Sequence, residues 1–139
     1  MPLAEALQMG FAPSSDWELL ARDVIGFRNP YELAERARLI SESPGFNVDR
    51  VSTPVLLLYG IRSVLLMSEG RPLFSALHRF KIPSALFVFD EDHGFFRPAA
   101  VVDNLVRTAE WLDYWVRGIS YPDKDRALEY DAWRSKPTQ

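Results

Sequence analysis

Two short runs of apolar residues, each bounded by proline or glycine, constrain the fold of this 139-residue chain more than any other feature. The first run, Val55–Tyr59, lies between Pro54 and Gly60, and the second run, Ser84–Phe89, follows Pro83. Neither run alternates between apolar and polar residues, which is typical of strands that are buried on both faces in a parallel sheet. We therefore predict two strands at the centre of the fold.

Helical patterns alternate with these strands. Proline, glycine and capping residues predict helices over 30–39, 68–79 and 99–117, with a charged tail helix over about 119–134. In the longest helix, apolar residues recur every three to four positions and predict one apolar stripe: Val101, Leu105, Ala109, Leu112 and Val116. The order strand, helix, strand, helix predicts an α/β fold with a mostly parallel sheet flanked by helices.

Composition excludes several classes of function. The net charge of −3 argues against a nucleic-acid partner, which would need clustered Lys and Arg. No apolar run is long enough to span a membrane, and the first residues do not resemble a signal peptide, so we expect a cytoplasmic protein. The absence of cysteine excludes disulfides and thiolate sites, and we predict no cofactor.

Functional groups of parallel α/β sheets lie on the loops that leave the carboxyl ends of strands, here 60–67 and 90–96. His93 lies on the second loop, where a histidine can act as a general base near neutral pH. The alternative is a surface histidine in an acidic turn. The other histidine, His78, falls late in a predicted helix and is interpreted as structural, and the pair has no metal-ligand spacing, so we predict no metal site.

Several segments, in order along most of the chain, resemble the catalytic domain of prolyl oligopeptidase-type α/β-hydrolases, a family of serine peptidases. The segments are Ala12–Trp17, Ser43–Pro44, Val51–Gly60, Leu73–Leu77, Ile82–Pro83, Phe89–Phe95 and Trp111–Trp115. Residues 118–123 and 127–134 resemble the C-terminal extension of the lasso peptide isopeptidases within that family. The alternative for this tail is a generic amphipathic helix that docks by Leu128 and Trp133.

In this family an elbow serine attacks a carbonyl, a histidine takes its proton and an acid orients the histidine. The resemblance assigns the role of base to His93. The seven glycines never have the G-x-S-x-G spacing of a nucleophile elbow, and the resemblance implies that the chain begins after the family's serine. We therefore expect residues 1–139 to form a single incomplete catalytic domain, without the oxyanion hole or the β-propeller of the family.

The acid of the triad is the second departure from the family pattern. In the family an aspartate follows the glycine that Gly60 matches, but residues 61–67 contain no carboxylate. Ser63 lies nearest to the expected position. Glu69 is the best local candidate for a substitute acid, and the alternative is a first-turn helix acid favoured by the helix dipole.

These features support two main hypotheses. The first is the C-terminal segment of a serine peptidase or isopeptidase, inactive alone, that acts on a peptide substrate when an N-terminal hydrolase segment completes it. The second is a truncated, non-catalytic, hydrolase-like protein that serves interaction or oligomerisation. An apolar sheet edge predicts a homo-oligomer or a complementing chain in either case. A third alternative is a fragment without independent biology.

Overall fold

The computed structural model describes residues 32–63, 66–121 and 129–133. Its sheet consists of two parallel strands, β1 (Val55–Gly60) and β2 (Ser84–Phe89). The strands pair in register from Val55 with Ser84 to Gly60 with Phe89. Both predicted strands are therefore confirmed, and they share one direction because a helical crossover joins them.

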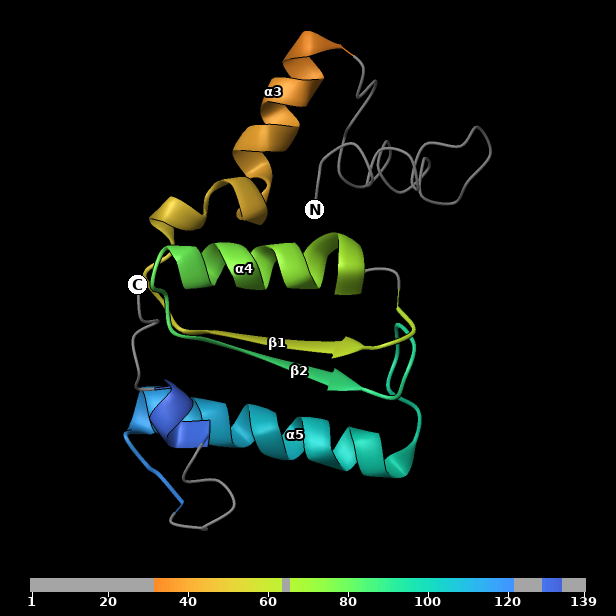
Figure 1. The fold of residues 1–139 in the computed structure, drawn as a ribbon, viewed down its shortest axis with the longest axis vertical. Helices are drawn as coiled ribbons and strands as arrows, with labels where there is room; N and C mark the ends of the chain where they lie inside the picture. Colours follow the sequence, from red (N-terminus) through yellow and green to blue (C-terminus); the bar gives the residue numbers. More distant parts are fainter. Residues whose placement is uncertain (1–31, 64–65, 122–128, 134–139) are drawn as a thin grey trace.

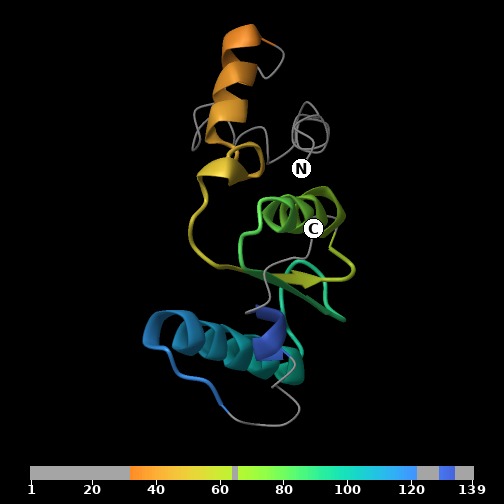
Figure 2. The same cartoon turned by 60° about the vertical axis from the view of Figure 1, so that its left-hand side comes forward.

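The helices cover both faces of this sheet. Figures 1 and 2 show α4 (Arg71–Arg79) on one face and α5 (Pro98–Leu112) on the other, so that the sheet is the middle of three layers. A π-helical turn, Leu66–Gly70, leads into α4, and a second, Asp113–Arg117, extends α5. The chain is thus a partial α/β fold, as the order of elements predicts.

A further helix, α3 (Leu33–Glu42), projects from the α4 side of the molecule (Figure 1). It begins and ends three residues later than predicted, and the cap predicted around residues 29–30 lies outside the described residues, as does the segment 12–17. The amide of Asn47 donates hydrogen bonds of 3.1, 3.0 and 2.9 Å to the carbonyls of Ile40, Ser41 and Ser43. These bonds satisfy carbonyls at the helix end, which explains why the helix continues beyond residue 39.

Each face of the sheet has its own core. Leu57 packs towards α4 with Val48, Leu77 and Ile82. On the opposite face, Ala85 packs with three aromatic residues of α5 and the tail: Trp111, Tyr130 and Trp133. Side chains of successive strand residues point to opposite faces, so a strand covered on both sides has to be apolar throughout.

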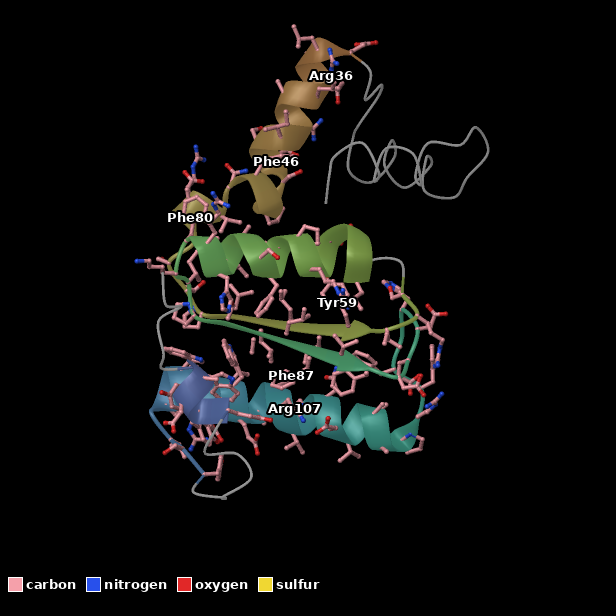
Figure 3. The ribbon with its side chains drawn as sticks, viewed as in Figure 1. Arg36, Phe46, Tyr59, Phe80, Phe87 and Arg107 are labelled. Atoms are coloured by element: carbon pink, nitrogen blue, oxygen red, sulfur yellow. The ribbon has the colours of Figure 1, made fainter. Side chains whose placement is uncertain are left out.

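The apolar stripe predicted for the longest helix does not pack on the sheet. Leu105, Leu112 and Val116 are exposed, whereas Trp111 of the opposite face is buried. On that face the guanidinium of Arg107 lies 4.1 Å from the centre of the Phe87 ring, between α5 and β2 (Figure 3). Periodicity identified an apolar face correctly, but the large aromatic side chains occupy the interface with the sheet because they bury more area.

The tail packs against α5. Residues 129–133 are helical, and the Trp133 ring contacts the Trp111 ring edge-on at 4.9 Å between centroids. Arg107 also donates a 3.2 Å hydrogen bond to Glu129. Docking by Trp133 is as predicted, whereas Leu128 lies outside the described residues and residues 119–121 are not helical, contrary to the predicted range. Within the described ranges no helix has the length and apolar character needed to cross a membrane.

Candidate functional site

The loop that carries His93 is bound directly to the end of β1. The amide of Ile61 donates a 2.8 Å hydrogen bond to the carbonyl of Phe89, and the amide of Arg62 donates a 3.0 Å bond to the carbonyl of Glu91. These bonds continue the pairing of β1 with β2 beyond the strand ends. They bring together the two loops that the sequence indicates as functional.

Gly60 makes this close approach possible. A Cβ atom at this position would lie 2.5 Å from the carbonyl oxygen of Glu91 and closer still to that of Asp92. Both obstacles are backbone atoms, so they cannot rotate away as the end of a side chain can. Only glycine lets the histidine loop lie directly on the strand end.

Two arginines clamp the loop through Asp90. Arg62 donates hydrogen bonds to the carboxylate of Asp90 at 2.5 Å and to its carbonyl at 2.9 Å, and Arg97 binds the other carboxylate oxygen at 2.5 Å. The hydrogen bond from Arg97, followed by the charges of Arg62 and Arg97, lowers the pKa of the Asp90 carboxyl below its ordinary value. The charged form of Asp90 therefore joins the end of β1 to the start of α5.

The other two acids of the loop accept hydrogen bonds from nearby backbone amides. Glu91 is buried, and its carboxylate accepts a 3.2 Å hydrogen bond from the backbone amide of Arg97. The carboxylate of Asp92 accepts a 2.8 Å hydrogen bond from the backbone amide of His93. These contacts shape the backbone around His93, and none of these hydrogen bonds involves the imidazole ring.

The side chain of His93 itself is exposed to solvent. Behind it, the Phe95 ring packs on the Phe89 ring at 4.8 Å between centroids and anchors the far side of the loop. The result is an accessible imidazole on a loop that is fixed at both ends. Such a group can accept and return a proton for a reacting group brought to this edge of the sheet.

Ser63 lies in the turn after β1, where its amide donates a 3.1 Å hydrogen bond to the carbonyl of Gly60. It is 4% exposed, so its hydroxyl is not presented to a substrate. Ser63, which the sequence places nearest to the expected position of the acid, is therefore a buried residue of the turn after β1. Ser63 therefore contributes to the structure of the turn after β1.

Glu69, the other candidate acid, lies in the π-helical turn before α4 and interacts with Tyr59. Burial, with a smaller contribution from the charge of Glu69, raises the pKa of Tyr59 above its ordinary value. Tyr59 points towards α4 (Figure 3) and packs on the core of that face. The charge of Glu69 thus acts on Tyr59, on the α4 side of β1.

Arg62 and Arg97 are the residues of this site that sequence reasoning missed. Arg62 and Asp90 are 28 positions apart, and their contact depends on the register of the two strands. The available signal was a basic residue inside the first loop, Arg62, and another directly after the second loop, Arg97. The ring of His78 lies 4.9 Å from that of Phe74 between centroids, tilted by 57°, in the last turns of α4. Among the described residues no group of three potential ligands is placed to hold a metal ion.

The sequence of this chain is similar to parts of two known peptidases. No family model matches the chain. The chain is 31% identical over 90 residues, 64% of its length, to the lasso peptide isopeptidase AtxE2 of Asticcacaulis excentricus. It is 30% identical over 86 residues, 60% of its length, to dipeptidyl-peptidase 5 of Porphyromonas endodontalis. Each match covers 12% of the relative's own length.

A solved structure of a variant of the AtxE2 isopeptidase with Astexin3-dC4 bound has a similar fold. It aligns with a TM-score of 0.66 at 24% identity, over 93% of this chain and 19% of that chain. The similarity shows that this arrangement of strands and helices occurs inside a much larger protein. The chain thus spans a small part of each protein that it matches.

Proposed function

Because this chain is homologous to peptidases of the prolyl oligopeptidase type, we propose that it is the C-terminal segment of a serine-type peptidase or isopeptidase. Partial coverage of both relatives fits such a segment. In this proposal residues 1–139 are one incomplete α/β-hydrolase catalytic domain, and β1 and β2 belong to a larger, mostly parallel sheet. An N-terminal hydrolase segment supplies the remaining strands and the serine.

His93 is the general base of the proposed reaction. The serine of the complementing segment transfers its hydroxyl proton to the imidazole as its oxygen attacks the carbonyl of an amide bond. His93 then returns that proton to the leaving amine, and the cycle is repeated with water. The observation that supports this role is the exposure of His93 on a loop held to the end of β1 by Gly60 and Arg62.

The test uses a fluorophosphonate probe, which labels activated serines. The chain is co-expressed with an upstream segment that contains a G-x-S-x-G motif, and labelling is followed over time. His93→Ala is expected to slow labelling by at least about 100-fold, because a general base contributes that much or more. His78→Ala is the matched control, since His78 is also exposed but lies on α4, and it should label at the wild-type rate. Unchanged labelling of His93→Ala would exclude His93 as the base.

The substrate in this proposal is a peptide, with either a main-chain amide bond or the isopeptide bond of a lasso peptide. The printed names of the relatives include both a dipeptidyl-peptidase and a lasso peptide isopeptidase. The two substrates are distinguished by incubating the complemented protein with a linear peptide and with a threaded lasso peptide. Mass spectrometry then shows which of the two gains a water molecule.

A non-catalytic role is the second candidate, and one observation favours it. Ser63, the residue nearest to the expected position of the acid, is buried, and the three acids next to His93 accept hydrogen bonds from backbone amides or from an arginine side chain. If this candidate is correct, neither the complemented wild type nor a complemented Ser63→Asp variant labels. If an acid is all that is missing, Ser63→Asp labels faster than the wild type, provided that circular dichroism confirms its fold.

A further inference from the structure

The loop that carries His93 is closed on itself by Arg97. One carboxylate oxygen of Asp90 accepts a 2.5 Å hydrogen bond from the guanidinium of Arg97, and the buried carboxylate of Glu91 accepts a 3.2 Å bond from the backbone amide of Arg97. These bonds join residues that are seven and six positions apart. They hold the loop in one shape, but they do not determine where His93 lies relative to the sheet.

Arg62 places this closed loop against the end of β1. Its guanidinium donates hydrogen bonds to the other carboxylate oxygen of Asp90 at 2.5 Å and to the carbonyl of Asp90 at 2.9 Å. Two backbone bonds, from Ile61 to Phe89 and from Arg62 to Glu91, hold the loop at the same place. The planar guanidinium binds at two further points, and this restricts the rotation of the loop about the backbone bonds.

The contact between the two loops has the opposite polarity to that of a Ser-His-acid triad. In such a triad a carboxylate orients the histidine through a direct hydrogen bond. Residues 61–67 contain no carboxylate, but they contain a cationic residue, Arg62. The matching acid, Asp90, lies on the other loop, three positions before His93. The two loops are thus joined by a charged pair whose carboxylate is on the loop of the histidine.

We propose that Arg62 is a positioning residue for His93, which acts through Asp90 in place of a direct bond from an acid. The inference rests on the proposed function, in which His93 is the general base. Because His93 is exposed, its placement depends on the backbone of its loop more than on packing of its ring. A base has to lie within hydrogen-bonding distance of the proton that it takes, and a displacement of about 1 Å can slow a reaction by about 100-fold.

The first test measures labelling of the complemented protein by the fluorophosphonate probe. Arg62→Ala is expected to slow labelling at least about 10-fold, because the loop loses its fixed placement. Arg62→Lys is expected to recover part of that loss, because an ammonium group can bind Asp90 but lacks the planar two-point geometry. Exposed ion pairs contribute little to stability, so both variants should remain folded, which circular dichroism verifies.

Arg117→Ala is the matched control for this test. Arg117 also binds an aspartate, Asp113, at 2.7 Å, and its side chain is 65% exposed, but it lies in the turn after α5. This variant should label at the wild-type rate. A wild-type rate for Arg62→Ala, or equal losses in Arg62→Ala and Arg62→Lys, would overturn the proposal. A loss in Arg117→Ala as large as that in Arg62→Ala would overturn it as well.

The second test needs no catalysis and uses the 139-residue chain alone. The chain has two histidines, so labelling with ¹⁵N-histidine gives two backbone amide signals, and His78 on α4 is the internal reference. Arg62→Ala is expected to lower the order parameter of the His93 amide from about 0.85, typical of rigid backbone, towards about 0.6, typical of flexible backbone, and to leave His78 unchanged. An unchanged order parameter at His93 would overturn the proposal. No labelling of the complemented wild type, together with the expected change at His93, would refute the proposed function and leave the placement of the loop by Arg62 standing.

Discussion

Replacement of Gly60 by alanine tests the central structural claim, that the histidine loop lies directly on the end of β1. The new methyl group would meet the carbonyl oxygens of Glu91 and Asp92, the first at 2.5 Å, and neither can move without the backbone. To relieve the overlap, the loop has to move away from the strand. That movement stretches the 2.8 Å bond from Ile61 to Phe89 and the 3.0 Å bond from Arg62 to Glu91.

The cost can be estimated from these contacts. Overpacking of this kind costs about 1–3 kcal/mol, and each strained hydrogen bond adds about 1 kcal/mol. We expect Gly60→Ala to lower the free energy of unfolding by about 3 kcal/mol. For a chain of this size that corresponds to a fall of roughly 10 °C in the melting temperature.

The assay is urea unfolding, followed by the fluorescence of the four tryptophans and by far-ultraviolet circular dichroism. Gly94→Ala is the matched control. Its methyl group would also come close to a neighbour, at 2.7 Å, but that neighbour is the ring of Phe96, which is 82% exposed and free to rotate. We expect the control to change stability by no more than about 0.5 kcal/mol. Equal stabilities for Gly60→Ala and the wild type would refute the proposed contact.

Two further predictions concern the loop clamp and the tail. The hydrogen bond from Arg97 and the charges of both arginines lower the pKa of Asp90, so the stabilisation from Asp90 is present above about pH 4, the ordinary value, and is lost as the pH falls through the folded-state pKa. Urea unfolding should therefore show the wild type more stable than Asp90→Asn at pH 6 and the two converging towards pH 3, and a pH-independent difference would contradict the clamp. Trp133→Ala removes a buried ring packed on Trp111 and should cost about 3–5 kcal/mol of unfolding free energy. The exposed substitution Val88→Ala should cost within about 0.5 kcal/mol, and similar costs for both would mean that the tail is not docked.

The elements that could be predicted from the sequence are those that neighbouring residues in the chain determine. Both strands appear where proline or glycine bounds an apolar run, α4 falls within its predicted range, and α5 begins one residue before its predicted start. Leu77 on α4 is 1% exposed. These features depend on residues close together in the chain.

The features that sequence reasoning missed depend on distant parts of the chain. Periodicity predicted one apolar stripe on α5 and its extension, which includes the exposed Leu105, Leu112 and Val116. It could not show that a second apolar face packs on the sheet, because that choice depends on the bulk of Trp111. The clamp between Arg62 and Asp90 depends on strand register, which no local pattern reveals. The positions of Ser63 and Glu69 relative to the imidazole depend on the turn after β1 in the same way.

The contacts of Gly60 and Arg62 with residues 89–92 also bear on the order in which this chain folds. Every one of these contacts joins segments about 28 positions apart, and none can form until α4 has returned the chain to lie beside β1. The histidine loop therefore acquires its shape as a late consequence of one crossover, rather than from its own sequence. Accordingly, amide hydrogens of Ile61 and Arg62 should gain protection from exchange together with those of β2, and their protection would report when the loop of His93 has formed.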